Sequence, residues 1–456
     1  MVHLVIKKGL NIPIKGSAEG KIQELNFKGR QIKPKKIALN LDPFPYTKFR
    51  LLVKEGDEVK IGQPLAIDKK HEKLHFVSPA CGRIVEIRRG LKRRLTDIVI
   101  ELDPHELYLE HPRIDVRNSS RGILLAHLLN AGLFASIRAR PFNYIADPNR
   151  TPRSIFVKVI ETAPFTPKAE LHIQGKEREF QLGLDVLSKL TDGKVHLCYG
   201  FDSDFSALKQ AKNVIHHEVE GPHPAGTFSV LIHHIDPILS SEDVVWTLDA
   251  RSVVAIGYLF LTGHYYIDKV VAIAGTGILE RGFFHVREGM PIVDLIDGRL
   301  AEGEMRLISG DPLNGEAVEI SDFLHFDHDT FTVLPTDHSR EFLHFFRLGS
   351  DKFTASRAYL SGFLKNKEYD FTTLQHGEHR ALITENLYEK VMPMAISVMG
   401  LMRALMAEDY DLAEELGLLE VVPEDFALPA FVCPSKVSML DIVKHGQECY
   451  ASDVLA

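Results

Sequence analysis

Histidine is the residue type that first suggests chemistry in this chain, because imidazole can ligate a metal or transfer a proton near neutral pH. The 22 histidines are most closely spaced at His325-Phe326-Asp327-His328-Asp329 and in the pairs His216-His217 and His233-His234. Adjacent side chains on a strand point to opposite faces, so such pairs make poor chelates. We interpret them as exposed loop histidines and predict no metal site, with metal binding as the alternative.

Glycine loops and cysteine clusters are the redox-cofactor sites that a sequence can show directly. The best glycine candidate, Gly275-Thr276-Gly277, lacks a third glycine and is followed by residues of strand character, which favours a hairpin turn over a dinucleotide loop. The four cysteines, Cys81, Cys198, Cys433 and Cys449, are far apart, whereas an iron–sulfur cluster takes about four closely spaced thiolates. The sequence therefore predicts neither site.

The segment Gly221-Pro222-His223-Pro224-Ala225-Gly226 is the most unusual in the chain. Its prolines and glycines fix a rigid turn, which either presents His223 at a cleft or shapes an interface. Both interpretations stay open. No Ser/His/Asp or Cys/His arrangement can be assembled from the spacing, so we predict no catalytic residue.

Composition narrows the class of protein. The chain has 456 residues, of which 45% are apolar and 25% charged, as in folded proteins of several domains. Its net charge of −8 argues against nucleic acid as a partner, and the basic run 88–94 is interpreted as a solvated hairpin, with an interaction patch as the alternative. Dispersed cysteines and an N-terminus unlike a signal peptide predict a reducing compartment. No apolar stretch reaches the roughly 20 residues of a membrane-spanning helix.

Residue periodicity and turn signals predict a multi-domain α/β protein. The predicted domains are a barrel-sandwich hybrid β domain at 1–105, a Rossmann-like α/β domain at 106–256, a β-grasp domain at 257–335 and a C-terminal helical domain at 336–456. In the first, the segments 53–65 and 78–84 resemble the biotinyl/lipoyl type of barrel-sandwich hybrid. Lys69 or Lys70 lies near the place of the modified carrier lysine, but the following loop is longer than the carrier pattern, which favours an unmodified structural module.

The elements that would position these residues follow from the same patterns. Strands are predicted at 154–159, 195–198, 269–274, 281–286, 305–309 and 331–334. Helices are predicted at 122–131, 182–190, 205–210, 291–296, 353–364, 387–406 and 412–421.

Four segments, 6–16, 131–142, 152–157 and 221–226, together with the β module, resemble the A subunits of Na+-translocating NADH:quinone reductases in order over nearly the whole chain. The resemblance implies a peripheral subunit without a transmembrane helix, on the cytoplasmic face of the inner (plasma) membrane. Its partners would be the other subunits of a complex that couples NADH oxidation and ubiquinone reduction to Na+ export, especially the membrane-embedded ones. In that family NADH, FAD and an iron–sulfur centre are bound by a different subunit, whereas this one has been associated with ubiquinone.

The domain order also resembles the flavin-bearing, NADH-oxidising subunit of complex I and its counterpart in the related Rnf complex. A glycine-rich loop there cradles FMN, but the matching stretch here, 129–134, contains one glycine, and Cys433 stands alone. The resemblance thus implies the fold without a tightly bound flavin or iron–sulfur centre, and it matches 295–298 and 308–315 to a β-grasp unit of the soluble-ligand-binding type. A free-standing flavin- or dinucleotide-binding redox enzyme is the alternative function.

A quinone site needs an apolar groove with a few hydrogen-bond donors to the carbonyl oxygens. Phe134, Arg138, Arg140 and Phe142 are the first candidates, because their segment takes the place of the flavin loop, and His223 is the second. The alternative is an ordinary packed element whose arginines pair with acids. Ubiquinone is the one ligand that these residues suggest.

Overall fold

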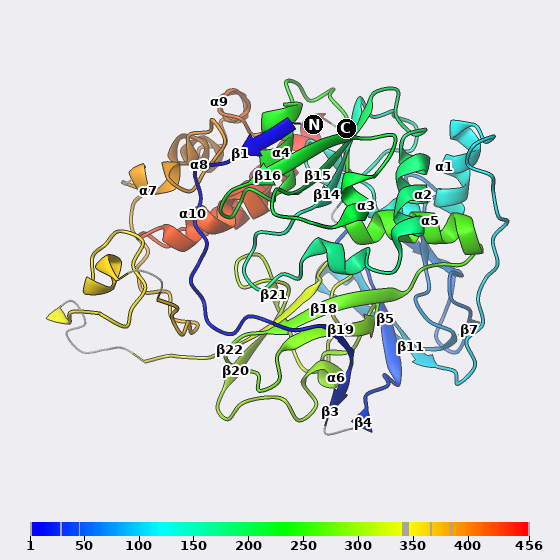
Figure 1. Cartoon of the computed structure of the whole chain (residues 1–456), viewed down its shortest axis with the longest axis horizontal. Helices are drawn as coiled ribbons and strands as arrows, with labels where there is room; N and C mark the ends of the chain where they lie inside the picture. Colours follow the sequence, from blue (N-terminus) through cyan, green and yellow to red (C-terminus); the bar gives the residue numbers. More distant parts are fainter. Residues whose placement is uncertain are drawn as a thin grey trace.

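The computed structural model describes residues 2–27, 30–44, 46–339, 346–364, 367–383 and 385–454. Figure 1 shows an elongated molecule with the N-terminal β domain at one end of its long axis and the C-terminal helices toward the other. The multi-domain α/β architecture that the sequence predicts is confirmed by three larger β units and the helical segment that follows them.

The N-terminal β domain consists of two antiparallel sheets that share one apolar core. One sheet has the order β5 (Lys36–Asn40), β11 (Leu95–Leu102), β10 (Gly82–Arg89) and β7 (Glu58–Val59), and the other β6 (Phe49–Leu51), β8 (Pro64–Asp68) and β9 (His75–Val77). Arg88 and Arg89 of the basic run end β10, and the rest of the run lies in the β10–β11 connection, where a short 3-10 turn, η1 (Leu91–Arg93), has no buried residue. The hairpin is confirmed and its tip is exposed, but Arg88 lies 3.5 Å from Asp322 of another unit, so the run is not solvated throughout. Lys69 and Lys70 are exposed in the β8–β9 connection.

The second unit is a seven-stranded sheet with helices packed on it. Its order is β1 (Val2–Val5), β16 (Ile215–Glu220), β15 (Lys194–Gly200), β14 (Ser154–Val159), β17 (Val245–Asp249), β12 (Arg138–Arg140) and β13 (Tyr144–Ile145). The five strands from β1 to β17 are parallel, while β12 runs antiparallel to β17 and β13 antiparallel to β12. Its helices are α1 (Arg121–Asn130), α2 (Glu177–Leu187), α3 (Ser206–Lys209), α4 (Phe228–Ile235) and α5 (Ala250–Thr262).

Chain order in this sheet reverses between β14 and β17. From β14 the chain steps outward to β15 and β16, and then returns to form β17 on the other side of β14. In open α/β sheets such a reversal leaves a crevice outside the carboxyl ends of the two strands, and ligands commonly bind there. The topology therefore points to the ends of β14 and β17 before any side chain is considered.

The third unit is a six-stranded mixed sheet around the short helix α6 (Ile292–Ile296). Its order is β2 (Ile22–Glu24), β19 (Gly282–Arg287), β18 (Asp268–Ala274), β22 (Thr330–Pro335), β20 (Met305–Ser309) and β21 (Glu316–Ala317). Gly275 and Gly277 lie in the connection between the antiparallel strands β18 and β19. This confirms the hairpin turn.

Two findings depart from the predicted domain limits. The first 24 residues are not confined to the β domain, because β1 joins the seven-stranded sheet and β2 joins the six-stranded one (Figure 1). The limit at 256/257 falls inside α5, where Gly257 packs so closely on α2 that an added Cβ would lie 1.7 Å from the Glu179 carbonyl oxygen. The N-terminal segment and α5 thus tie neighbouring units together.

The C-terminal region is helical, as predicted, but the positions and lengths of its helices differ from the prediction. The helices are α7 (Asn386–Glu389), α8 (Val398–Met406), α9 (Tyr410–Glu415), α10 (Ala427–Val432) and α11 (Met439–Val454). Residues 353–364 form only a 3-10 turn, η5 (Leu360–Phe363), and the predicted helix 387–406 is broken around Pro393. The predicted helix 412–421 ends at Glu415, and the longest helix, α11, was not predicted. Nowhere in the described ranges is a helix long and apolar enough to cross a membrane.

Candidate functional site

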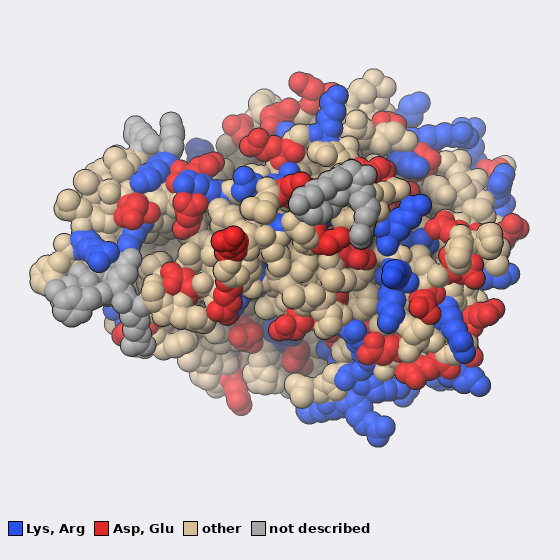
Figure 2. Space-filling model, turned by 90° about the horizontal axis from the view of Figure 1, so that it is seen from below, with Lys and Arg blue, Asp and Glu red and all other residues tan. Residues whose placement is uncertain are grey.

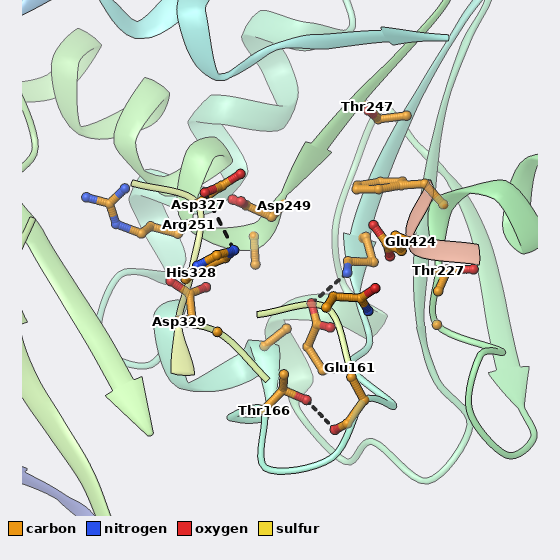
Figure 3. A pocket seen from close by; sticks show the side chains of 18 of the residues that line it. Glu161, Thr166, Thr227, Thr247, Asp249, Arg251, Asp327, His328, Asp329 and Glu424 are labelled. Atoms are coloured by element: carbon orange, nitrogen blue, oxygen red, sulfur yellow. Dashed lines mark hydrogen bonds and ion pairs between the residues drawn. The ribbon is translucent and has the colours of Figure 1, made fainter. Parts of the chain in front are cut away.

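A pocket of about 350 Å³ lies where the strand order reverses. Its walls come from β12, the carboxyl ends of β14 and β17, the start of α5, and two loops of the six-stranded unit. In Figure 3, Asp249, Arg251 and Asp327–Asp329 lie on one side of this pocket, and Thr227 and Glu424 on the other. The pocket thus lies between the seven-stranded unit, the six-stranded unit and the C-terminal region.

Arg138 lies on β12 and lines the pocket. Its Nη2 donates to the Pro43 carbonyl oxygen at 2.9 Å, and its guanidinium lies 4.8 Å from the centre of the Phe44 ring. Nη1 is buried and has no hydrogen-bond partner among the described residues. Burial lowers the pKa of Arg138, and the nearby carboxylates of Asp327 and Asp249 oppose that effect. Arg138 Nη1 can therefore donate a hydrogen bond to an acceptor that enters the pocket.

Arg140 lies two residues along β12 and therefore projects to the same face of the sheet. Its side chain is buried, and its Nη1 donates to Ser229 Oγ at 2.8 Å. Nε finds no partner within the described part of the chain. Burial lowers the pKa of Arg140 and raises that of Asp425 to about 6, while the attraction between the two groups acts against both shifts.

His223 is the third predicted residue that reaches the pocket. It is buried, and its Nδ1 lies 3.2 Å from Thr162 Oγ1. The main-chain N–H of His223 donates to Asn11 Oδ1 at 2.9 Å, which fixes the turn against the N-terminal segment. Burial and the positive charge of Lys158 lower the pKa of His223 to about 4, so the ring is neutral at pH 7. Of the two interpretations of this turn, the structure favours the cleft.

Phe134 and Phe142 do not line the pocket. Phe134 is fully buried and packs edge-on against Trp246 at 5.5 Å. Phe142 belongs to the core that includes the C-terminal helices and lies 5.8 Å from the Tyr450 ring. The structure therefore brings Arg138, Arg140 and His223 together and places both phenylalanines in the apolar core.

The charged residues of the pocket are the part that sequence reasoning missed. Lys158 Nζ lies 2.9 Å from Glu161 Oε1 and 5.2 Å from the centre of the Phe228 ring. Asp249 ends β17 and caps α5 by accepting from the Ser252 N–H at 2.7 Å. One available signal was the position of Lys158 and Asp249 at strand ends, where polar residues follow an apolar run.

A second group of pocket charges comes from the six-stranded unit. Asp329 accepts from Lys269 Nζ and from His172 Nε2, each at 3.2 Å. Burial acts to raise the pKa of Asp329, but Lys269 and His172 outweigh it and hold the pKa well below its usual value. Asp329 and His172 line the pocket, and the Asp329 carboxylate is already paired.

Several histidine predictions need correction. His328 is largely buried, lines the pocket and has its Nδ1 3.0 Å from Ser309 Oγ, so it is not an exposed loop histidine. His233 and His234 lie on the helix α4, not on a strand. His217 is buried on β16 and its Nε2 lies 2.9 Å from His196 Nδ1. Across the residues that the structure describes, no group of three or more His, Cys, Asp or Glu side chains is arranged to hold a metal ion.

Fold and site together define a multi-domain α/β protein with a polar pocket at the strand reversal of its central sheet. Residues 4–103 match the family described as the NqrA N-terminal barrel-sandwich hybrid domain, 120–265 the NqrA second alpha/beta domain, and 270–319 the NQRA C-terminal domain. These matches follow the order of the β domain, the seven-stranded unit and the six-stranded unit.

Three relatives that align over nearly the whole chain share one name. The A subunit of the Na(+)-translocating NADH-quinone reductase of Chlamydia caviae is 37% identical over 467 residues, covering 99% of this chain and 97% of the relative. That of Photorhabdus laumondii is 37% identical over 434 residues, covering 94% and 95%, and that of Tolumonas auensis 37% over 437 residues, covering 95% and 96%. The chain belongs to the family of Na+-translocating NADH-quinone reductase A subunits.

A fainter likeness extends to a solved NAD+-reducing nickel–iron hydrogenase in the H2-reduced state. It is 12% identical with a TM-score of 0.36, over 51% of this chain and 52% of that chain. A likeness this weak carries no argument about function.

Proposed function

We propose that this chain works as a peripheral subunit of a membrane complex that couples NADH oxidation and ubiquinone reduction to Na+ export. Its relatives are named as the A subunits of such reductases and are aligned over nearly their full lengths. Its partners are then the other subunits of that complex, and its place is the cytoplasmic face of the inner membrane. Its role is in assembly and in contact with the quinone, without a tightly bound cofactor of its own.

The finer fold assignments belong to the same proposal. The order β16-β15-β14-β17 of parallel strands supports a Rossmann-like unit. The two sheets around one core support the biotinyl/lipoyl type of barrel-sandwich hybrid. The mixed sheet around α6 supports a β-grasp unit of the soluble-ligand-binding type.

The quinone contact is assigned to the pocket at the strand reversal. The observation that carries it is the pair of buried N–H donors, Arg138 Nη1 and Arg140 Nε, that have no partner among the described residues. A buried donor without an acceptor costs about 1–3 kcal/mol, so an acceptor that reaches it is strongly favoured. A quinone presents two carbonyl oxygens, which accept hydrogen bonds and carry no charge into a pocket already lined by carboxylates.

A neutral ligand also suits the rest of the pocket. Lys158 is paired with Glu161, and Arg251 with Glu288 at 2.7 Å, so these two cations are already balanced. Phe228 and Phe326 supply apolar surface among the charges. His223, held neutral, offers a polar ring atom without adding charge.

The alternative, a free-standing flavin enzyme, has less support. Gly132 lies in the stretch that corresponds to the flavin loop of complex I relatives, and an added Cβ there would lie 2.6 Å from Val77 Cγ1 of the β domain. Leu129, Leu133 and Phe134 around it are buried. This stretch therefore packs against protein where a phosphate-binding loop would need open backbone N–H groups.

Quinone titration of the isolated full-length chain tests the proposal. Trp246 is the one tryptophan of the sequence, and it precedes the pocket residues Thr247 to Asp249 on β17, so its fluorescence reports on the pocket wall. We expect saturable binding of a short-chain ubiquinone by fluorescence and calorimetry. Arg140→Met should weaken it by about tenfold or more, because a hydrogen bond from a charged donor contributes about 1.5–3 kcal/mol.

Arg150→Met is the matched control, since the Arg150 side chain is 36% exposed, pairs with Glu242 and lies outside the pocket. It should leave the affinity unchanged. An absorption spectrum of the same sample tests the alternative. No saturable binding, or equal binding by Arg140→Met and the wild type, would contradict the quinone contact, and a stoichiometric flavin spectrum would favour the redox enzyme.

A further inference from the structure

A second feature lies outside the pocket, in residues 346–364, which we name the apolar lobe. Figure 1 shows this segment, in yellow, at the end of the long axis opposite the N-terminal β domain. Phe346, Leu348 and Phe363 are 79%, 76% and 72% exposed, and Leu360 and Leu364 are about half exposed. Elsewhere in the described part of the chain few large apolar side chains reach such values, and they are scattered.

The lobe holds these side chains together. The Leu360 N–H donates to the Leu348 carbonyl oxygen at 2.9 Å, and Ser361 Oγ donates to the Lys352 carbonyl oxygen. Gly349 approaches the Tyr359 ring closely, where an added Cβ would lie 2.4 Å from Cδ1. The two halves of the lobe are therefore side by side, and their exposed apolar residues form one patch. Contiguous exposed apolar surface of this kind marks an interaction site.

The charged residues of the lobe indicate what kind of surface the patch binds. The lobe carries Arg347, Lys352 and Arg357 against Asp351 alone, in a chain whose net charge is −8. Figure 2 shows Lys and Arg side chains at this same end of the molecule, with Asp and Glu side chains beside them. Basic side chains beside exposed phenylalanine and leucine fit a surface that is anionic outside and apolar inside, as an anionic phospholipid bilayer is.

A hollow lies next to the patch. It has a volume of about 570 Å³ and lies between the lobe and the N-terminal segment. Ile12, Pro13, Phe353, Leu364 and Tyr369 give it apolar walls, and Asn11, Thr354, Ser361, Lys367 and Glu368 line its polar side. Lys367 Nζ donates to the Ser350 carbonyl oxygen at 2.7 Å and lies 5.5 Å from the centre of the Tyr369 ring. The hollow is therefore mixed in polarity and holds a carboxylate as well as a cation, so the lipid assignment rests on the exposed side chains of the lobe and not on the hollow.

We propose that the apolar lobe docks this chain directly on the surface of an anionic phospholipid bilayer, with Phe346, Leu348 and Phe363 entering the headgroup boundary. The basic residues then lie at the level of the phosphates, and their aliphatic stems lie along the apolar patch. This contact is separate from the pocket and does not depend on quinone binding there.

Vesicle flotation of the purified full-length chain tests the lobe. We expect it to float with vesicles of phosphatidylglycerol and phosphatidylcholine, to float poorly with phosphatidylcholine alone, and to lose binding in high salt. Phe363→Ser should weaken partition about tenfold, because it removes a large apolar side chain from the boundary. Arg357→Gln should weaken it about fivefold, since one basic residue near such a surface contributes about 1 kcal/mol.

Two matched variants distinguish binding through the lobe from nonspecific binding through any exposed apolar or basic residue. Leu239 is 81% exposed and Arg281 is exposed, and both lie outside the lobe. Leu239→Ser and Arg281→Gln should bind as the wild type does. Because all four positions are exposed, melting temperatures should stay the same.

Three results would overturn the lipid assignment. They are no flotation of the wild type with anionic vesicles, equal losses in the lobe and control variants, and a concentration-dependent dimer that Phe363→Ser abolishes in the absence of vesicle binding. The last would make a second copy of the chain the occupant of the patch. None of the three bears on quinone titration at Arg140, so the two proposals fail separately.

Discussion

Arg251 Nη2 lies 2.7 Å from Glu288 Oε2, and both side chains are buried. Arg251 belongs to the first turn of α5, and Glu288 follows β19. Tyr265 adds a hydrogen bond to the other carboxylate oxygen of Glu288 at 3.1 Å. Burial acts to lower the pKa of Arg251, but Glu288 outweighs it, so that the pKa lies above the usual value and the guanidinium stays charged. The pair thus joins the two units that form the pocket.

Glu288→Gln should destabilise the protein by about 3 kcal/mol, because it leaves Arg251 charged, buried and unbalanced. Glu106→Gln is the control, since Glu106 pairs with Arg287 at 2.5 Å but is about half exposed. It should cost less than about 1 kcal/mol. Melting temperatures of the two variants compare the effects, and equal shifts would show that the buried pair has no special role.

Gly257 and Gly122 are both helical glycines, and they should respond to alanine in opposite directions. A Cβ at Gly257 would meet the Glu179 carbonyl oxygen at 1.7 Å, so Gly257→Ala must push α2 and α5 apart. Overpacking of this kind costs about 1–3 kcal/mol. A Cβ at Gly122 in α1 has nothing within 4 Å, and Gly122→Ala should stabilise by about 0.5 kcal/mol, because alanine loses less entropy in a helix. Urea denaturation midpoints check the pair, and loss of stability in Gly122→Ala would contradict this account.

Lys69 and Lys70 should be unmodified. Both are exposed in the β8–β9 connection, and the Lys70 N–H donates to Asp68 Oδ1 at 3.0 Å. The β8–β9 connection instead faces the seven-stranded unit, where His71 Nε2 lies 3.9 Å from Asp147 Oδ1. The intact mass of the chain purified from its own cells should equal that of the sequence, and an added lipoyl or biotinyl mass would make the domain a carrier.

Strands could be predicted from the sequence far better than the C-terminal helices. Residues 154–159 form β14 as predicted, because a continuous apolar run bounded by turns has few alternatives. Helix α11 was missed because Gly446 and Gln447 lie on its buried face, where the periodic pattern calls for apolar residues. Gln447 is buried there because its Nε2 donates to the Leu418 and Val421 carbonyl oxygens, which is a tertiary contact that no local pattern contains.

The candidate site was predictable only in part, for a related reason. Arg138 and Arg140 are two residues apart on one strand, so the sequence already predicts that their side chains lie on the same face of the sheet. Phe134 and Phe142 flank them closely, yet local spacing cannot distinguish an aromatic that lines a pocket from one that fills the core. Asp249 and Asp327 come from segments that meet only through the fold, so no sequence pattern could join them to the arginines.

The buried pair His196 and His217 should make stability depend on pH. Burial lowers the pKa of both rings, that of His217 to about 4, and their contact at 2.9 Å requires at least one neutral nitrogen acceptor. In the unfolded chain each ring has a pKa near 6.5, so the unfolded state binds more protons between about pH 4 and 6.5. The contribution of the pair is therefore complete above pH 6.5 and is lost as the pH falls toward 4.

His217→Gln keeps a hydrogen-bonding side chain at this position but cannot take up a proton. We expect it to reduce the fall in melting temperature between pH 7 and pH 5 relative to the wild type. His285→Gln is the control, because His285 is exposed on β19, and it should leave that fall unchanged. Other buried histidines, such as His127 with a pKa lowered to about 4 by burial, contribute to the remaining slope. An unchanged slope in His217→Gln would mean that protonation of the pair does not limit stability in acid.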